Sequence, residues 1–393
     1  MKQVTLGLDR LLTDPEAYLR GETFGLIVNQ TSQTSDGYPS IPRFHSLTRF
    51  QLVTLFAPEH GLYGVNQDMA AVADHVDFPS GLPVKSLYGT DSSSLTPSPD
   101  LLRGLDNLIF DIQDVGSRYY TFIYTLANCM QVCAKTDTRM IVCDRPNPIN
   151  GVTVEGNLVG GKYRSFVGQY PLPNRHGMTV GELANLYNKH FEIGCDLTVI
   201  PMQGWKRTMW YDQTGLSWVA PSPNMPTLST ATVYPGMCLI EGTLLSEGRG
   251  TTLPFEQIGA PYIQAETLSE TLNAENLPGL FFRPHYFKPQ FQKWSGEVCG
   301  GVQLHVKARE IFKPFLTGIA VLCSIKKLHP EDFSWRTEPY EFVSDHPAID
   351  LLYGNSTLRE GMESGNVCLQ ELEASWNGEM EEFLQRREEH LLY

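Results

Sequence analysis

Apolar segments alternate with amphipathic ones along the first half of the chain. Five short runs rich in aliphatic, β-branched and aromatic residues are predicted as buried strands, at residues 23–29, 50–57, 107–112, 139–144 and 196–202. Helices are expected between them: near 99–105, over 119–135, where apolar residues recur at helical spacing, and from Thr179, where Glu182 completes a capping box. Strands and helices alternating at these lengths predict a Rossmann-like α/β domain with a mostly parallel sheet.

The pattern changes around residues 218–235, which are rich in proline and irregular. Beyond them, residues 238–251, 300–308 and 315–328 predict strands and helices of a smaller α+β module, with the apolar run from Phe315 read as a buried strand. We therefore expect two domains, a catalytic one over 1–229 and a smaller one over 230–393 that completes the cleft. A glutamate-rich helix with a solvated charged face is predicted at the C-terminal end.

Composition excludes several classes of protein. The chain has 393 residues, 41% of them hydrophobic and 19% charged, as expected of a folded globular protein. The net charge of −14 argues against nucleic-acid and anionic-membrane partners. The apolar run from Phe315 covers only about half of the roughly 20 residues that a membrane span needs.

The compartment expected from the sequence is the cytoplasm. The first twenty residues show no signal peptide, and the eight cysteines include no CxxC pair, so buried free thiols in a reducing environment are expected. A signal removed before residue 1 would instead indicate a periplasmic or secreted protein.

Polar clusters follow three of the predicted strands directly. Residues 58–61 (PEHG), 113–121 (QDVGSRYYT) and 145–148 (RPNP) each begin where an apolar run ends. In an open parallel sheet the carboxyl ends of neighbouring strands share one edge, and ligands bind in the crevice there. The sequence therefore predicts one cleft lined by acidic, basic and amide side chains, as in an enzyme that acts on a polar substrate.

Glu59 is the leading catalytic candidate. Pro58 and Gly61 constrain the turn that carries it, and partial burial favours the protonated form of a carboxyl group, which suits a general acid. Asp114 is its expected partner, and Glu247 is the reserve for that role. The simpler alternative is that Glu59 caps a loop and that Asp114 forms a structural ion pair with Arg118.

The other candidates are assigned to substrate binding, some with equally plausible structural roles. Arg118 could bind an anionic group, and His176 could be a structural histidine before a helix start. The full set of binding candidates is His60, Gln113, Arg118, Tyr119, Arg145, Asn147, Arg175, His176, Asn224, Glu247 and Arg249.

Cofactor motifs are absent from the sequence. There is no HExxH, GxGxxG, GxxxxGK[ST] or GxSxG, so neither a catalytic metal, a nucleotide cofactor nor a serine triad is expected. We expect a metal-free enzyme without an organic cofactor.

Taken together, the motifs resemble those of the NamZ family of exo-β-N-acetylmuramidases. The segments that carry the resemblance are PEHG, DIQDVGSRYYT, DRPNP, PLPNRHGMTVGELA, PSPNMP and YPGMCLIEGTLLSEGRGTTLPFEQIGAP, and the similarity runs from about Leu6 to the C-terminus. It implies a Rossmann-like domain, a smaller C-terminal domain and an active site between them. It also implies release of N-acetylmuramic acid (MurNAc) from non-reducing ends of peptidoglycan fragments such as MurNAc-GlcNAc, with Glu59 at the position of the family's catalytic candidate.

Glycoside hydrolysis is consistent with these residues, since it typically uses two carboxyl groups. Their separation would decide the stereochemistry, at about 5–5.5 Å for retention and roughly 6.5–9.5 Å for inversion, and substrate assistance by the N-acetyl group is a further route. The lactyl carboxylate of a muramyl sugar would need an arginine, for which Arg118, Arg145, Arg175 and Arg249 are the candidates. The alternatives are a metal-dependent amidase or deacetylase acting on muramyl material and a non-catalytic muramyl-sugar-binding protein.

Overall fold

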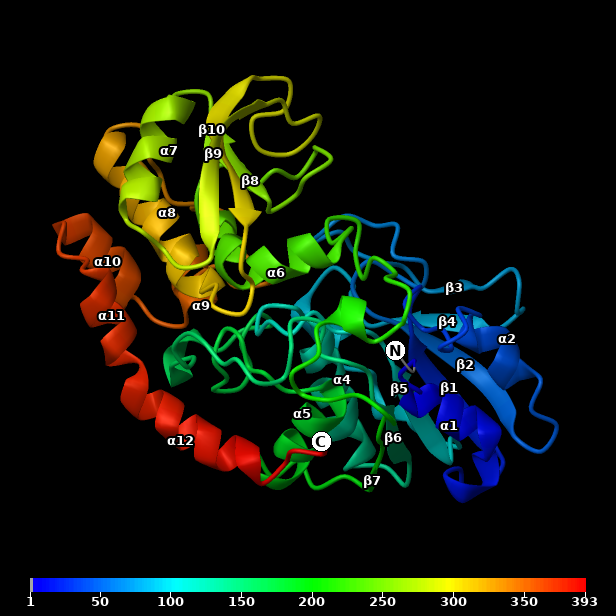
Figure 1. Ribbon diagram of the computed structural model, residues 1–393. Coiled ribbons are helices and arrows are strands. Elements are labelled where there is room, and N and C mark those ends of the chain that lie inside the picture. Colours follow the sequence, from blue (N-terminus) through cyan, green and yellow to red (C-terminus); the bar gives the residue numbers. More distant parts are fainter. Residues whose placement is uncertain (1–2) are drawn as a thin grey trace.

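The computed structural model describes residues 3–393, which form two sheets flanked by helices (Figure 1). The larger sheet has seven strands in the order β3-β4-β2-β1-β5-β6-β7. Their bounds are β1 Thr23–Val28, β2 Gln51–Ala57, β3 His75–Val76, β4 Pro83–Ser86, β5 Asn107–Asp111, β6 Arg139–Cys143 and β7 Leu197–Ile200. All neighbouring pairs are parallel except β3 with β4. The prediction of a mostly parallel α/β sheet is confirmed.

Helices cover both faces of this sheet, which explains why its central strands are apolar along their whole length. Phe24, Leu26 and Val28 of β1 pack in one core with α1 (Gly7–Thr13) and α2 (Ser40–His45). Ile27 of β1 points to the opposite core, beneath the remaining helices of this part. These are α3 Pro99–Leu102, α4 Phe122–Cys133 and α5 Val180–Lys189. The Thr179–Glu182 capping box starts α5 as the sequence predicts.

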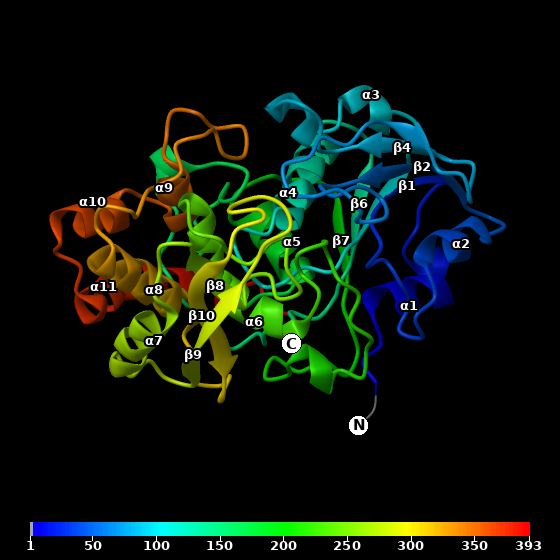
Figure 2. The same cartoon turned by 90° about the horizontal axis from the view of Figure 1, so that it is seen from above.

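The second half is built on a three-stranded antiparallel sheet, seen beside the larger sheet in Figure 2. Its order is β8-β10-β9, with β8 Gln257–Ala260, β9 Leu280–Phe287 and β10 Cys299–Val306. Helix α7 Ala265–Ala274 packs on β9 and β10, α8 Pro314–Leu328 packs on α7, and α6 Leu228–Met237 packs on α8. The α+β character predicted for this half is confirmed.

The apolar run from Phe315 forms helix α8, so its prediction as a buried strand is wrong. Pro314 occupies the first turn, where a proline is tolerated, and α8 packs against both α6 and α7. Gly318 allows the closest approach, because a Cβ there would lie 2.2 Å from the carbonyl oxygen of Gly236. A helix buried on most sides loses the polar stripe by which a sequence pattern would identify it.

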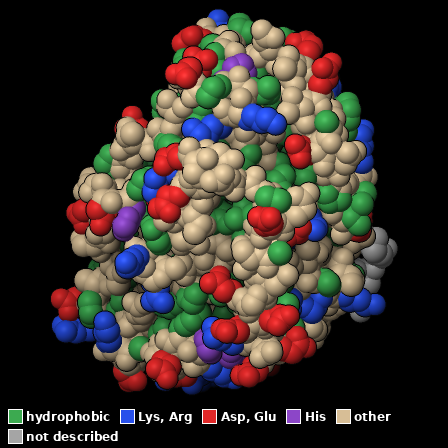
Figure 3. All heavy atoms as spheres, turned by 90° about the vertical axis from the view of Figure 1, so that its left-hand side faces the viewer, with side chains coloured by type: hydrophobic (Ala, Val, Ile, Leu, Met, Phe, Trp, Pro, Cys, Tyr) green, Lys and Arg blue, Asp and Glu red, His purple; other side chains and the backbone are tan. Residues whose placement is uncertain are grey.

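After the buried helix α9 Ala348–Tyr353, three helices return along the outside of the molecule to the first half (Figure 1). They are α10 Thr357–Ser364, α11 Leu369–Ser375 and α12 Asn377–Glu388, and five short 3-10 segments lie elsewhere, at Pro15–Ala17, Ser92–Leu95, Gly161–Tyr163, Tyr211–Gln213 and Cys238–Gly242. On the face that carries these helices, acidic and basic side chains are interspersed rather than gathered in one patch (Figure 3). No helix within residues 3–393 is long and apolar enough to cross a bilayer.

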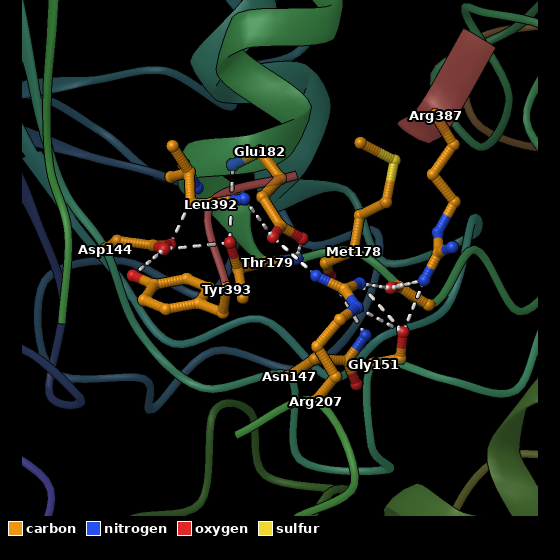
Figure 4. A network of polar contacts seen from close by, with 12 residues as sticks. Asp144, Asn147, Gly151, Met178, Thr179, Glu182, Arg207, Arg387, Leu392 and Tyr393 are labelled. Carbon is orange, nitrogen blue, oxygen red and sulfur yellow. Dashed lines mark hydrogen bonds and ion pairs between the residues drawn. The ribbon is translucent and has the colours of Figure 1, made fainter. Parts of the chain in front are cut away.

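The C-terminal residue closes a buried polar network in the first half (Figure 4). The Tyr393 hydroxyl donates to Asp144 Oδ2 at 2.7 Å, and Thr179 Oγ1 donates to the same oxygen at 2.8 Å. Leu392 N donates to Glu182 Oε1 at 2.9 Å. Residues 392 and 393 thus anchor the outer helices to the carboxyl end of β6 and to the start of α5.

Tyr393→Phe should therefore lower stability, because a buried carboxylate loses a donor worth about 1.5–3 kcal/mol. The expected result is a lower melting temperature, measured by thermal unfolding. The matched control is Tyr38→Phe, since Tyr38 is exposed and the phenyl ring keeps its contact with Arg43. Equal melting temperatures for the two variants would contradict the anchoring role.

Candidate active site

Glu59 lies in a tight turn just beyond the carboxyl end of β2. His60 and Gly61 both have left-handed backbones, with φ of 70° and 79°, and Gly61 N bonds back to Pro58 O at 3.0 Å. A histidine in this conformation is uncommon, so the turn depends on its surroundings to hold it. His60 Nδ1 lies 2.9 Å from Asn66 O, and its ring packs edge-on against Phe122.

Two donors fix the Glu59 carboxyl group. Thr121 Oγ1, at the start of α4, donates to Oε2 at 2.7 Å, and Met69 N donates to Oε1 at 3.2 Å. Glu59 is buried at 5% exposure, and within residues 3–393 no Lys or Arg lies within ion-pair distance of it. The strand end, the helix start and the loop before β3 therefore converge on one carboxyl group.

Glu59 lines a narrow inner chamber of about 40 Å³. Aromatic side chains form much of the wall, and the acids Asp68, Glu241 and Glu341 line it with Glu59. The complete lining is Glu59, His60, Asp68, Met69, Tyr119, Tyr120, Thr121, Val167, Ser222, Asn224, Met225, Tyr234, Glu241, Arg249, Phe255, Tyr340 and Glu341.

An outer cleft of about 420 Å³ adjoins the inner chamber. The two share Asp68, Met69, Glu241 and Arg249, and the outer cleft adds mostly charged and polar side chains. These are Leu244, Glu247, Gln292, Lys293, Arg336 and Glu338. The site therefore narrows from a polar entrance to an aromatic and acidic interior.

Arg249 lies where the chamber meets the outer cleft, and it pairs with three carboxyl groups. Its guanidinium lies 2.8 Å from Glu241, 3.2 Å from Glu247 and 3.3 Å from Asp68, and it stacks over Phe255. Burial would lower the pKa of Arg249, but these carboxylates outweigh it and raise that pKa well above its usual value. Arg249 is thus permanently charged and already neutralised by its neighbours.

Glu247 is held ionised in this network. Burial alone would raise the pKa of Glu247, but the charges of Lys293, at 2.9 Å, and Arg249 outweigh it and hold that pKa at about 2. A carboxyl group that stays ionised cannot donate a proton near neutral pH. Glu247 is therefore a poor general acid.

Several predicted site residues come together at this site. Glu59, His60, Tyr119, Asn224 and Arg249 line the chamber, and Glu247 lines the outer cleft. Asn224 Nδ2 also donates to Gln67 Oε1 at 2.9 Å, which ties the proline-rich segment to the loop after Glu59.

Asp114, the expected second carboxyl group, lines neither the chamber nor the outer cleft. Its Oδ2 accepts from Gly116 N at 2.7 Å and lies 3.6 Å from His176 Nε2. The alternative role for Asp114, an ion pair with Arg118, is not formed among residues 3–393 either. Asp114 closes the turn after β5, and the geometry gives no support to a catalytic role.

The other predicted binding residues secure the loops around the site. Arg118 donates to the carbonyl oxygens of Asn157, Leu172, Leu352 and Tyr353. The remaining contacts are Arg145 to Asp111 at 2.7 and 2.9 Å, Arg175 to Ile149 O, Asn147 to Met178 O, Gln113 to the carbonyl oxygens of Asp114 and Pro146, and Met178 N to His176 Nδ1. All six are buried and line neither cavity, so substrate contact stays a prediction that the geometry does not support.

The sequence pattern missed several lining residues, above all Glu241, Tyr340 and Glu341. Glu241 lies eight residues before Arg249, in a segment that carries the family resemblance, but nothing in its local pattern singled it out as a site residue. Glu341 lies in an irregular loop, and no repeating pattern or motif marks it.

Among residues 3–393, no group of three His, Cys, Asp or Glu side chains is arranged to hold a metal ion.

Comparisons with known proteins cover the whole chain. Residues 24–229 match the family profile "Exo-beta-N-acetylmuramidase NamZ, N-terminal", and residues 232–393 match the corresponding C-terminal profile. The chain is 44% identical over 391 residues to the peptidoglycan beta-N-acetylmuramidase NamZ of Bacillus subtilis (strain 168), covering 100% of this chain and 92% of the relative. Two crystal structures of DUF1343 family proteins from Bacteroides fragilis NCTC 9343 are similar, with TM-scores of 0.88 and 0.76 at 34% and 29% identity. Each covers 100% of this chain and 99% of its own.

Proposed function

Because the chain belongs to the exo-β-N-acetylmuramidase NamZ family, we propose that it releases MurNAc from the non-reducing ends of peptidoglycan fragments. The protein is a glycosidase, and the bond it hydrolyses is the β-glycosidic bond of a terminal MurNAc, as in MurNAc-GlcNAc. The observation that carries the proposal is the placement of Glu59. It is a buried carboxyl group, fixed by two donors, in the wall of a chamber lined largely by aromatic side chains.

The shape of the site supports action at a chain end. The chamber adjoins a single wider cleft, so once its walls have moved apart it would take a terminal sugar and leave the rest of the glycan in the cleft, whereas an internal sugar would need two wide exits. Tyr119, Tyr120 and Tyr234 offer ring faces or edges for the apolar face of a sugar, together with hydroxyl groups. As described, the chamber has room for about one or two water molecules, so sugar binding requires its walls to move apart.

The test compares the two disaccharides MurNAc-GlcNAc and GlcNAc-MurNAc. Release of MurNAc from the first and no hydrolysis of the second is the expected result, followed by chromatography of the free sugars. Hydrolysis of GlcNAc-MurNAc at an equal rate would contradict specificity for a terminal MurNAc.

The lactyl carboxylate of MurNAc distinguishes it from N-acetylglucosamine (GlcNAc), and Arg336 is the side chain that we propose meets it. The other two cations of the outer cleft, Arg249 and Lys293, are already paired with carboxylates. Arg336 is half-buried and forms no ion pair within residues 3–393. It stacks on Tyr340 at 5.2 Å and donates to Pro339 O at 3.3 Å. A guanidinium of this kind can bind a ligand carboxylate through two parallel hydrogen bonds.

Arg336→Met should weaken binding of free MurNAc by about tenfold to a hundredfold, the value of a charge-assisted hydrogen bond. Binding of GlcNAc should stay unchanged, and calorimetric titration measures both. Arg283→Met is the control, since Arg283 lies on β9 outside the chamber and the cleft, where it bonds to Gln303. An equal loss of affinity for both sugars would show that Arg336 does not bind the lactyl carboxylate.

A further inference from the structure

Glu341 reaches the chamber from the second half of the chain, whereas Glu59 reaches it from the end of β2 in the first half. The loop that bears it closes on itself through two hydrogen bonds of 2.9 Å between the backbones of Tyr340 and Val343. The Tyr340 hydroxyl donates to Glu241 Oε2 at 2.7 Å and fixes the base of the loop. Glu341 is buried at 6% exposure and lines the chamber together with Glu59.

The backbone of this loop is in a costly conformation. Glu341 and Phe342 have φ of 46° and 65°, a region that side chains other than those of glycine, asparagine and aspartate rarely adopt. Two such residues in a row persist only where the surroundings hold them, and strain of this kind gathers at functional sites. The conformation directs a glutamate into an acidic chamber, which stability alone would not favour.

Contacts across the two halves fix the position of Glu341. The Tyr88 hydroxyl, which follows β4, lies 3.0 Å from Glu341 Oε2, and the Tyr88 ring packs against Phe342 with centroids 5.4 Å apart. The pKa of Tyr88 is raised by burial first, and then by the negative charges of Glu59 and Glu341. The Tyr88 hydroxyl is therefore close enough to Glu59 and Glu341 for both of their charges to raise its pKa.

Glu59 and Glu341 share one small space without a basic partner. Within residues 3–393 neither forms an ion pair with Lys, Arg or His. Both oxygens of Glu59 accept hydrogen bonds, whereas Glu341 meets a hydroxyl that can act as donor or acceptor. Burial, and then the charge of Glu59, raise the pKa of Glu341 well above its usual value. Near neutral pH, the raised pKa favours the protonated form of Glu341.

We propose that Glu341 is the second catalytic carboxyl group, the proton donor to the leaving sugar, with Glu59 as the carboxylate that faces the reacting carbon. The proposal rests on the glycosidase function above and goes beyond it by assigning the catalytic pair. It reverses the role expected for Glu59 from the sequence and replaces Asp114 as its partner.

The glycosidic C1–O bond breaks with its electron pair on the leaving oxygen, and that oxygen takes the proton of Glu341. The Glu59 carboxylate stabilises the positive charge that develops at C1. Water then forms the new C1–O bond and gives its proton to Glu59, from which it can return to Glu341 before the next cycle.

Substrates with different leaving groups separate the two roles. Glu341→Gln should lower kcat/KM for MurNAc-GlcNAc by about 10²–10⁴-fold, because its sugar leaving group needs a proton. With 2,4-dinitrophenyl β-MurNAc, whose leaving group departs without a proton, the same variant should stay within about tenfold of wild type. Glu59→Gln should lose activity on both substrates.

Three outcomes would overturn the assignment while wild type is active. These are wild-type activity of Glu341→Gln on the disaccharide, equal losses by Glu341→Gln on both substrates, and a Glu59→Gln variant that keeps activity on the dinitrophenyl substrate. Failure of the wild type to cleave either substrate would instead overturn the glycosidase function itself. Asp345→Asn, on the same loop but exposed and outside the site, should match wild type.

The melting temperature separates a loss of catalysis from a loss of folding. Glu341→Gln should melt at or above the wild-type temperature, because it removes a buried acid from the chamber that also holds Glu59.

The pH dependence of a Tyr88 variant tests whether Glu341 is the titrating acid. Tyr88→Phe removes only the hydroxyl whose hydrogen bond lowers the pKa of Glu341, so the alkaline limb of its kcat/KM profile should move to higher pH. An alkaline limb that stays in place in Tyr88→Phe would contradict Glu341 as the titrating acid.

Discussion

Glu59→Gln is expected to abolish turnover of MurNAc-GlcNAc, with kcat lowered by at least about 10³-fold. Glutamine has the same shape, and the Thr121 hydroxyl can rotate to accept from the new amide, so the turn after β2 keeps its contacts. The variant cannot carry the negative charge that stabilises the transition state, nor accept a proton from water. The loss therefore falls on kcat, whereas binding of the sugar is retained.

Steady-state kinetics and calorimetric titration with free MurNAc measure the two parts of this prediction. Glu22→Gln is the matched control, since Glu22 is exposed before β1 and lines neither the chamber nor the outer cleft. Full activity in Glu59→Gln would remove Glu59 from the mechanism. Loss of binding together with activity would show that its main role is to hold the sugar.

Arg249→Met is expected to destabilise the protein by about 3–5 kcal/mol, the usual cost of leaving a buried charge without its partner. The side chain pairs with Glu241, Glu247 and Asp68 where chamber and cleft meet. Without Arg249, the three carboxyl groups repel one another where they are largely shielded from water, and their pKa values in the folded state rise. The folded state of the variant then binds protons more tightly than the unfolded state. Its stability deficit should therefore be larger at pH 7 than at pH 5.

Thermal unfolding of wild type and variant at both pH values tests this. Arg103→Met serves as control, because Arg103 pairs with Asp100 in full contact with solvent, where such a pair contributes little. The double variant Arg249→Met with Glu241→Gln should recover part of the lost stability. A deficit that is equal at pH 5 and pH 7 would show that packing on Phe255, and not charge, explains the effect.

The fold of the first half was predictable because its signals are local. Apolar strands covered on both faces, a capping box and alternating helices specify a parallel sheet without reference to distant residues. The prediction of a strand from Phe315 is wrong because local signals alone cannot distinguish a fully buried helix from a buried strand. A helix enclosed by α6 and α7 has no polar stripe, and only its tertiary neighbours show what it is.

The active site was predictable only in part. Polar residues after each strand pointed to the edge of the sheet beside which the chamber lies, and Glu59 lines that chamber, but they could not show which other side chains face a cavity. Arg118 and Arg145 turn inward to backbone carbonyls and to Asp111, which fixes the loops instead. Glu341 comes from a loop far along the chain, and its position depends on a contact with Tyr88 that no sequence pattern encodes.

The central claim is that a terminal MurNAc, and no internal sugar, reaches Glu59 in the chamber. Mass spectrometry of an alternating MurNAc–GlcNAc oligosaccharide, digested from a MurNAc non-reducing end, tests it most directly. We predict free MurNAc and a chain shortened by one sugar, after which digestion stops at the exposed GlcNAc. Internal fragments without free MurNAc would contradict the account.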